Sequence, residues 1–301
     1  MLSILIPIYN CDVTKLVDEL HKQCGTAKIL FEILCFDDGS SNKYRQANAS
    51  LASYIGVNYT EMSKNLGRAK IRNWLAKSAS YDNLLFLDCD SKLTNKTFIK
   101  RYLKVMDKAP VISGGRIYSK RKPTAQSKIL HWKYGKFRES KSEAYRNKHP
   151  YLFFHTNNFL IKKQLILDIK FDESIYGYGY EDLLFAQLLK EKGLTIRHIE
   201  NPVQHLGLEK TEIFLSKTRK SLDNLLLLNY KGQVLPTRLV QLADRIIALG
   251  FHEDFMKLFE RFESYILKNL HGPKPSMRYM DAFKLNYYLK QRHKLIYDRK
   301  L

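Results

Sequence analysis

The sequence has no long uninterrupted apolar segment. A membrane-spanning helix needs about 18 consecutive apolar residues, and the nearest stretch, residues 222–228, is interrupted by Asp223 and Asn224. The opening MLSILIPIYN lacks the charged leader and the small-residue cleavage site of a signal peptide, and it has the pattern of a first β-strand instead. We therefore expect a cytoplasmic protein that is soluble or peripheral on the inner face of the membrane.

Cysteine is scarce, and acidic residues are outnumbered by basic ones. Cys11, Cys24, Cys35 and Cys89 form no CxxC pair, which argues against a zinc site or a disulfide framework and favours structural thiols in a reducing compartment. Lys and Arg number 51 against 30 Asp and Glu, for a net charge of +21. This excess favours anionic partners such as nucleotides, phospholipids or nucleic acid, but a solvated lysine-rich surface explains it equally well.

The sequence also has no glycine-rich phosphate loop after its first strand. Pro7-Ile8-Tyr9-Asn10 stands where a dinucleotide-binding fold would place GxGxxG. The hypothesis that the chain is an ordinary nicotinamide-dependent oxidoreductase therefore loses its main support. A nucleotidyltransferase with a similar sheet would need a triphosphate-binding loop at the same place.

Short apolar runs bounded by turn residues are present at residues 3–8, 31–36 and 84–87, and a helix of about 10 to 15 residues is predicted before each of the last two. Residues 111–113, 151–161 and 195–204 are further strand candidates. The basic stretch 118–150 is interpreted as a long excursion or an acceptor-facing insertion. The alternation predicts an α/β fold with a mainly parallel sheet, helices on both faces, and a ligand site beyond the carboxyl ends of the strands.

From about Glu209 onward the periodicity is helical, with one helix ending at Gly250. We predict a catalytic domain over residues 1–208 and a C-terminal helical subdomain over 209–301. Residues 278–301 interleave aromatic and basic side chains, which suits an anionic membrane surface. A helix that packs on the catalytic domain with a charged outer face is the alternative.

Acidic residues follow two of the predicted strands. Asp37-Asp38-Gly39-Ser40 ends the second strand, where an acidic side chain can accept a hydrogen bond from the N3–H of uracil, although such a sequence can also be only a turn with a helix cap. Asp88-Cys89-Asp90 follows the strand at 84–87. Two carboxylates there can hold Mg²⁺ or Mn²⁺ against a diphosphate, because both ions prefer oxygen ligands and share them with phosphate.

Three further patterns supply cations, carboxylates and an imidazole. Arg68 and Arg72 share one face of a predicted helix and can grip a base or a diphosphate; the alternative is a solvated helix with Trp74 and Leu75 in the core. Gly177-Tyr178-Gly179-Tyr180-Glu181-Asp182 precedes an apolar helix, where a carboxylate is a candidate general base or only a helix cap. His205 is a candidate third metal ligand, although a lone histidine is more often structural.

Taken in order, these motifs resemble the inverting family 2 glycosyltransferases of the GT-A fold. Those enzymes run PxYN, DDGS, NxGxxxxRN, DxD, FDE, GGED or a relative, and a late His, and each has a counterpart here between Pro7 and His205. Two departures are the DxD, which reads DCDS, and Tyr180 at a position that is usually small. Tyr180 bears on the shape of the acceptor pocket.

The resemblance implies a role for each matching residue. Asp38 and Arg72 would contact the nucleobase, and Asp88 and Asp90 would bind ribose, diphosphate and Mn²⁺ or Mg²⁺, with His205 as a further ligand. Asp182 would be the catalytic base, and Glu181 would orient the acceptor or the loop. The nucleotide-sugar site would also include Pro7, Tyr9, Asn10 and Arg68. The implied activity is inverting, metal-dependent transfer of a hexosyl or N-acetylhexosaminyl group, with UDP as the expected carrier, to a hydroxyl of a glycan or lipid-linked acceptor in bacterial surface polysaccharide synthesis.

A basic nucleic-acid-binding protein is the rival from another class. The charge of +21 and the 19 tyrosines could supply backbone contacts and stacking platforms. No nucleic-acid motif accompanies them, so we expect no nucleic-acid partner.

Overall fold

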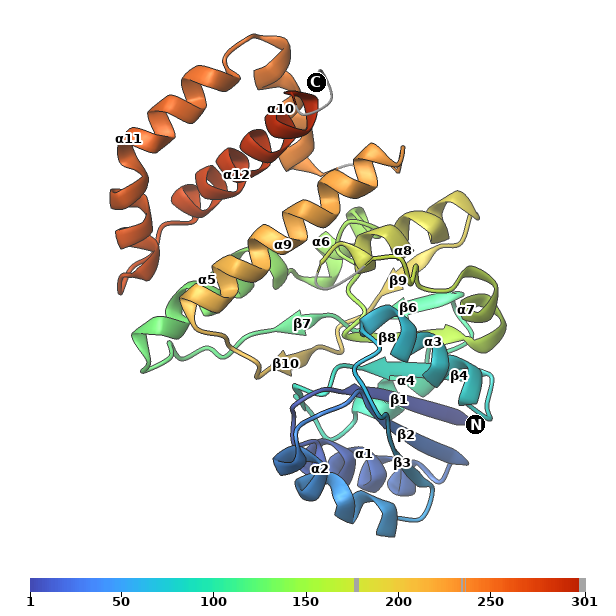
Figure 1. Ribbon diagram of the computed structural model, residues 1–301. Coiled ribbons are helices and arrows are strands. Elements are labelled where there is room, and N and C mark those ends of the chain that lie inside the picture. The colour runs from blue at the N-terminus through green and yellow to red at the C-terminus, as the bar shows by residue number, and fades with distance from the viewer. Residues whose placement is uncertain (176–178, 234, 236, 298–301) are drawn as a thin grey trace. The chain divides into compact units, whose positions relative to one another are not determined.

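The computed structural model describes residues 1–175, 179–233, 235 and 237–297 and separates into two compact units (Figure 1). The first, here called the sheet unit, comprises Met1–Ser119, Phe137–Tyr176 and Glu181–Gly207. The second, the helical unit, comprises Lys120–Lys136, Gly177–Tyr180 and Leu208–Leu301. Part of the predicted excursion thus groups with the C-terminal helices, while the division into domains at residue 209 stays a prediction. Gly177 and Tyr178 of the predicted carboxylate motif lie outside the described residues.

A seven-stranded sheet forms the centre of the sheet unit. Its order is β3-β2-β1-β4-β8-β6-β9. Neighbouring strands run parallel except at the two edges of β8, which is antiparallel to both β4 and β6. The predicted α/β fold with a mainly parallel sheet is confirmed. The strands are β1 (Leu2–Ile8), β2 (Phe31–Asp37), β3 (Val57–Glu61), β4 (Asn83–Leu87), β6 (Val111–Ser113), β8 (Asn158–Lys162) and β9 (Ile196–His198).

Helices cover both faces of this sheet because its central strands are apolar on both sides. Along β1, Leu2, Ile4, Ile6 and Ile8 pack with α1 (Thr14–Ala27) and α4 (Phe98–Leu103). Leu5 faces the other way, toward α3 (Arg68–Ser78), α7 (Lys163–Ile169) and α8 (Glu181–Glu191). Burial on both faces explains why β1 is a continuous apolar run and not an alternating one. The remaining helices of this unit are α2 (Asn42–Asn48), the 3₁₀ turn Ala49–Ser53 and α6 (Glu143–Lys148).

A second, three-stranded sheet carries the residues that follow β4. It is ordered β5-β10-β7 and consists of β5 (Ser91–Leu93), β7 (Arg116–Ile117) and β10 (Val203–His205). Strand β10 is antiparallel to β5 and places His205 opposite Ser91. This pairing brings the late histidine next to the DxD sequence.

The helical unit is built from α5 (Ile129–Tyr134), α9 (Thr211–Tyr230), α10 (Arg238–Ala248), α11 (His252–His271) and α12 (Met277–Tyr297), with a 3₁₀ turn at Gln126–Lys128. Helices α11 and α12 run side by side (Figure 1). Its core includes Leu130 of α5, Phe214 of α9, Phe259 of α11 and Phe283 of α12. A π-helical turn, Gly135–Glu139, follows α5 directly in the chain. The predicted C-terminal helices are confirmed, and none of the described helices is both long and apolar enough to cross a membrane.

Several predicted elements differ in extent. Strand β8 begins at Asn158 and not at Tyr151, because the chain turns at residues 151–153 and again at 156–157. The run 195–204 is two strands, β9 and β10, in different sheets, separated at Asn201-Pro202. Trp74 is 44% exposed, so Leu75 alone of that pair joins the core. Aromatic and apolar residues of α12 are buried, among them Met280, Phe283, Tyr288 and Leu289, which favours packing over membrane contact for this helix.

Candidate active site

Polar side chains gather where the parallel strands β1, β2 and β4 end. Asn10, Asp38 and Asp88 follow these three strands, whose carboxyl ends meet at one edge of the sheet. The loops after β1 and β2 are tied together, since the backbone N–H of Asn10 donates to Ser40 Oγ at 2.8 Å and that of Ser41 donates to Asn10 Oδ1 at 2.9 Å. Tyr9 on this fixed loop is 53% exposed.

Asp38 anchors the loop that leads into α3. Its two oxygens accept hydrogen bonds from the backbone N–H groups of Leu66 at 2.6 Å and Gly67 at 3.1 Å. Burial raises the pKa of Asp38, and these two backbone hydrogen bonds oppose the rise. Gly39 is required here, because its φ is +76° and a Cβ would lie 2.8 Å from Asn65 N. Asp38 therefore sets the position of the loop from which Arg68 begins α3.

Asp88 lies between two arginines. Arg72, 2% exposed, donates from Nη2 to Asp88 Oδ1 at 2.7 Å, and Arg116 Nη2 lies 3.9 Å from Asp88 Oδ2. Arg72 also places its guanidinium over the ring of Phe171, 5.7 Å from the centroid. The Nε atoms of both arginines are buried and have no hydrogen-bond partner among the described residues. Such buried donors indicate a place for a polar ligand or water.

Asp90 and His205 form the second pair at this edge. Their Oδ1 and Nδ1 atoms lie 3.3 Å apart, and Leu206 N donates to the Asp90 carbonyl at 2.9 Å. Burial acts to raise the pKa of Asp90, but His205, Arg116 and Arg68 outweigh it and lower the pKa to about 2. Gly207 packs directly on this carboxylate, since a Cβ there would lie 2.2 Å from Asp90 Oδ2.

Asp182, in the first turn of α8, is held by the segment that precedes β8. Thr156 donates from its backbone N at 3.2 Å and from Oγ1 at 2.6 Å, one bond to each carboxylate oxygen, and His155 Nδ1 lies 3.8 Å from Oδ2. Burial acts to raise the pKa of Asp182, but His155, Arg72 and Thr156 hold it well below its usual range. The side chain is 26% exposed, so an ionised carboxylate remains accessible.

Glu181 is in a different environment from its neighbour. Its side chain is 8% exposed, and its Oε1 lies 3.3 Å from Arg68 Nη1. Glu181 and Asp182 belong to the sheet unit, whereas Tyr180, with φ +69°, groups with the helical unit. There Tyr180 is close to Lys284, and burial raises its pKa.

The FDE sequence is attached to α3 through Asn73. The Asn73 amide donates to Phe171 O at 3.0 Å and to Glu173 Oε1 at 2.9 Å, and its Oδ1 accepts from Phe171 N at 2.9 Å. These hydrogen bonds from Asn73 connect two separate sequence motifs, NxGxxxxRN and FDE. The connection places the ring of Phe171 beside Arg72.

The predicted metal ligands are only partly brought together. Asp90 and His205 offer a carboxylate and an imidazole side by side, a donor pair that suits Mn²⁺ or Mg²⁺ completed by diphosphate and water oxygens. Asp88 is engaged by the arginines, and in the part of the chain that the structure describes, Asp88, Asp90 and His205 do not bring three ligand atoms within 4.8 Å of one another. The residues present therefore fit a metal held by Asp90 and His205.

Sequence reasoning missed four residues of this site: Arg116, Glu139, His155 and Thr156. Arg116 also pairs with Glu139, from Nη1 to Oε2 at 3.0 Å. Glu139 lies in the basic stretch 118–150, which its sequence predicts to be an excursion or an insertion. These residues belong to no motif. Only the fold brings Arg116 to Asp88, Glu139 to Arg116, and His155 and Thr156 to Asp182. Glu139 is one of only two acidic residues in the basic stretch 118–150, with Glu143, and this composition alone does not single it out.

Comparison with known structures shows the fold. The crystal structure of S. aureus TarS 1-349 superposes with a TM-score of 0.50 over 98% of this chain and 91% of that one, at 20% identity. The complex of TarS 1-349 with UDP-GlcNAc gives a TM-score of 0.51 at 19% identity over the same shares of the two chains. The mannosyltransferase PcManGT from Pyrobaculum calidifontis, in complex with GDP-Man and Mn²⁺, gives a TM-score of 0.58 at 13% identity, over 96% of this chain and 84% of that one. The sheet unit and the helices therefore follow a GT-A architecture.

Comparison of sequences shows the family. The uncharacterized glycosyltransferase YfnE of Bacillus subtilis (strain 168) is 24% identical over 245 residues, which are 65% of this chain and 62% of that protein. The chain thus spans less than two thirds of the length of this relative. The family model "Glycosyl transferase family 2" matches residues 3–169, more than half of the chain. The chain therefore belongs to glycosyl transferase family 2.

Proposed function

We propose that this chain transfers a sugar, with inversion, from a nucleotide diphosphate sugar to a hydroxyl of a glycan or glycolipid acceptor. One observation carries the proposal. The consecutive residues Thr156 and Asn157 hold the two sides of the site, since Thr156 donates to Asp182 and the Asn157 carbonyl accepts from the backbone N–H of Asp88 at 3.1 Å. Asp182, a carboxylate suited to proton abstraction, is thus fixed beside the end of β4, where Asp88 begins the segment that suits a diphosphate.

The donor would lie over the carboxyl ends of β1, β2 and β4. Pro7, Tyr9 and Asn10 would line the nucleoside, and Asp38, which keeps lone pairs beyond its two backbone bonds, would accept the N3–H of uracil. The contacts of Arg72 favour a positioning role toward Asp88 over the base contact expected from the resemblance. Arg68 and Arg116 would then supply positive charge to the diphosphate.

Asp182 would act as the general base. An inverting displacement at the anomeric carbon needs a carboxylate that accepts the proton of the attacking hydroxyl while the sugar–diphosphate bond breaks. Asp182 is ionised and more exposed than Glu181, whose carboxylate faces Arg68. Glu181 would therefore orient the loop and Arg68, and it would not take the proton.

Asp90 and His205 would hold the divalent ion, Mn²⁺ or Mg²⁺. When bound, this ion supplies positive charge that stabilises the departing diphosphate. Around it, Arg116 and Arg68 would add charge from the protein itself, and Gly207 would keep the Asp90 carboxylate in place.

Further details of the reaction are part of the same proposal. The donor is taken to be UDP-linked and the transferred group a hexose or N-acetylhexosamine, in the synthesis of a bacterial surface polysaccharide. The TarS structures were solved with UDP and UDP-GlcNAc, and the PcManGT structure with GDP-Man and Mn²⁺. These neighbours support a nucleotide-sugar donor and a metal, but they differ in the base and the sugar.

A panel of nucleotide sugars tests the proposal. We expect metal-dependent hydrolysis of one UDP-sugar, loss of that hydrolysis in excess chelator, and loss in Asp90→Ala. Full turnover in excess chelator would refute the metal dependence. No hydrolysis of any donor, together with salt-sensitive binding of oligonucleotides, would favour the nucleic-acid-binding alternative.

An anionic membrane surface is a proposed partner, and the exposed residues of α11 support a contact there better than those of residues 278–301. Most large apolar residues in the first part of α12 are buried, among them Met280, Phe283 and Leu289, whereas Leu258, Phe262 and Tyr265 of α11 are 58%, 49% and 60% exposed. Their spacing of four and three residues puts them on one face of the helix. Exposed Arg261 and Lys268 each follow a member of this stripe by three residues, and the combination suits a surface of anionic lipids on which a lipid-linked acceptor could be met.

A further inference from the structure

A cluster of metal-binding side chains lies in the helical unit, on residues that the transfer reaction does not use. His252 and Glu253 begin α11, and His293 lies on α12. One ligand atom from each of the three lies within 4.8 Å of the other two. None of these residues belongs to the sheet unit, which contains Asp90 and His205.

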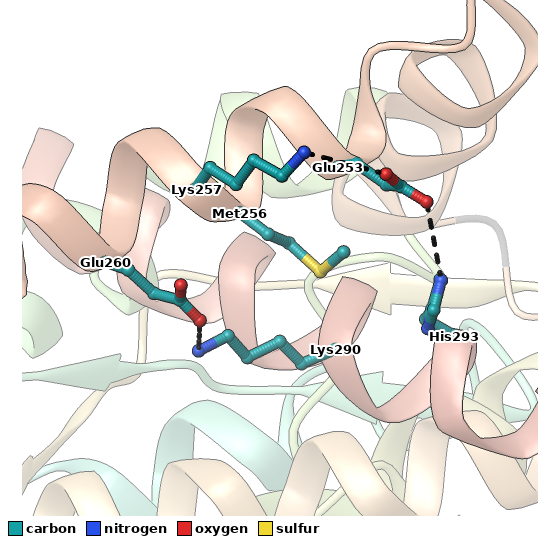
Figure 2. Close-up of a pocket in the computed structure, with 6 residues that line it drawn as sticks. All are labelled: Glu253, Met256, Lys257, Glu260, Lys290 and His293. Carbon is teal, nitrogen blue, oxygen red and sulfur yellow. Dashed lines mark ion pairs between the residues drawn. The ribbon is translucent and has the colours of Figure 1, made fainter.

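Each of the three side chains brings a ligand atom into the same small region. His293 Nε2 lies 4.0 Å from Glu253 Oε1 (Figure 2), and the imidazole rings of His252 and His293 have centroids 5.9 Å apart. His252 Nδ1 is buried and accepts or donates no hydrogen bond within the described residues. A buried imidazole nitrogen without a partner beside a carboxylate and a second imidazole is an incomplete polar site, and a cation would complete it.

We propose that His252, Glu253 and His293 bind a zinc ion. Two imidazoles and one carboxylate are ligands that Zn²⁺ takes together, with a fourth position left for water. Imidazole ligands favour Zn²⁺ over Mg²⁺ or Ca²⁺, which prefer sites made of oxygen. The ion would join the start of α11 to α12 and fix the pairing of these helices.

A pocket of about 290 Å³ opens beside the cluster and gives room for the fourth ligand. Glu253 and His293 line it with Met256, Lys257, Glu260 and Lys290 (Figure 2). The two lysines do not exclude a cation. Lys290 Nζ is paired with Glu260 Oε1 at 2.8 Å, and Lys257, whose side chain is 74% exposed, reaches only 3.9 Å from Glu253 Oε2. An exposed, flexible lysine at that distance can move into solvent when an ion binds.

The test uses Co²⁺ as a visible substitute for Zn²⁺ in the full chain carrying Asp90→Ala, which removes the ion expected at the donor site. We expect one equivalent of Co²⁺ to produce the visible d–d absorption of a four- or five-coordinate site, and Zn²⁺ to abolish it by displacement. Adding His293→Ala should remove the absorption and weaken Zn²⁺ binding more than about a hundredfold, since loss of a residue that only supports a ligand already costs about 10- to 100-fold. No absorption in the Asp90→Ala protein, or absorption that survives His293→Ala, would overturn the proposal.

Matched variants separate metal ligation from a structural role. His271→Ala removes another α11 histidine that faces a glutamate, Glu212, at 3.3 Å, and it should leave the Co²⁺ spectrum unchanged. Glu253→Gln keeps the side-chain volume and should weaken Zn²⁺ binding. It replaces His293→Ala in the test if His293→Ala does not fold. Lys257→Gln removes the competing cation, so Zn²⁺ should bind about twofold to fivefold more tightly. Weaker binding in Lys257→Gln, or a changed spectrum in His271→Ala, would count against this assignment.

Discussion

At the scale of single residues, adjacent carboxylates in α8 acquire different chemistry from their neighbours. Asp182 is held by Thr156 and His155 and remains 26% exposed, whereas Glu181 is 8% exposed and faces Arg68. We predict that Asp182→Asn lowers transfer by about a hundredfold to ten-thousandfold, the usual loss for a general base, while donor affinity stays close to wild type. The amide keeps the volume but cannot take the proton of the acceptor hydroxyl. Single-turnover transfer with saturating acceptor, beside a donor-binding titration, measures both quantities.

Glu181→Gln is the control for this base assignment. It removes the negative charge that faces Arg68 without touching Thr156, so a smaller loss of transfer is expected, with some loss of donor affinity. If Asp182→Asn transfers sugar at nearly the wild-type rate, or loses donor binding in proportion to activity, Asp182 is a structural residue.

His198 at the end of β9 makes the stability of the sheet unit depend on pH. Its partners define its tautomer, because Arg146 can only donate, at 2.8 Å to Nδ1, and the Pro150 carbonyl can only accept, at 2.9 Å from Nε2. Burial, with the nearby charge of Arg146, lowers the pKa of His198 to about 4 from 6.5, although the bond to Pro150 opposes the shift. Between these two pH values the unfolded chain binds a proton that the folded chain does not.

The free energy of unfolding should therefore decrease as the pH falls from about 6.5 to about 4, with a slope from this group approaching about 1.4 kcal/mol per pH unit. Above pH 6.5 the imidazole is neutral in both states and contributes no slope. Denaturant titrations at a series of pH values on wild type and His198→Gln measure the effect. Curves that stay parallel from pH 7 to pH 4 would show that His198 is not the group responsible.

At the scale of elements, the turn after β2 determines the position of the donor edge. Gly39 combines a φ of +76° with a backbone contact, since a Cβ would lie 2.8 Å from Asn65 N and from Lys64 C. Gly193 has nearly the same φ, +69°, and nothing within 4 Å of its Cβ position. The two glycines therefore separate conformational strain from a steric clash.

We predict that Gly39→Ala destabilises the chain more than Gly193→Ala. The control should cost about 1–2 kcal/mol from the left-handed backbone alone, and Gly39→Ala about 1–3 kcal/mol more from overpacking. Gly39→Ala should also weaken donor binding, because the 64–67 loop would leave the Asp38 carboxylate. Denaturant unfolding and donor titration of both variants are the measurements. Equal stability losses with unchanged donor affinity would mean that the loop adapts.

The sequence predicted the elements that are long and apolar, and it missed those that depend on contacts. Strands β1, β2 and β4 are buried apolar runs, so their approximate bounds and the carboxylates after them could be read directly. Strand β3, Val57–Glu61, lies at the edge of the sheet and has no fully buried residue, so its apolar signal is only the two partly buried residues Val57 and Tyr59. Strands β5 and β7 are two or three residues long and depend on β10 for their pairing. Arg116 and His155 reach the site only through this long-range packing, which local patterns do not encode.

At the scale of the whole molecule, the net charge of +21 and the exposed α11 stripe make a joint prediction. The charge attracts the protein to any anionic surface, nucleic acid included, and this attraction weakens with salt. Leu258, Phe262 and Tyr265 add an apolar contribution that a lipid surface would use fully and that salt does not screen. The two contributions can therefore be separated by experiment.

We predict that the protein sediments with vesicles containing an anionic phospholipid and much less with neutral vesicles, and that about 0.5 M salt reduces the binding by screening. Leu258→Ser with Phe262→Ser should weaken binding to anionic vesicles about tenfold or more, because each side chain contributes roughly 1–2 kcal/mol when it leaves water. Ile55→Ser, which changes an 89% exposed residue of the sheet unit, is the matched control and should have no effect. If the α11 double variant binds vesicles as wild type does, the attraction is purely electrostatic and α11 is not the membrane-contacting element.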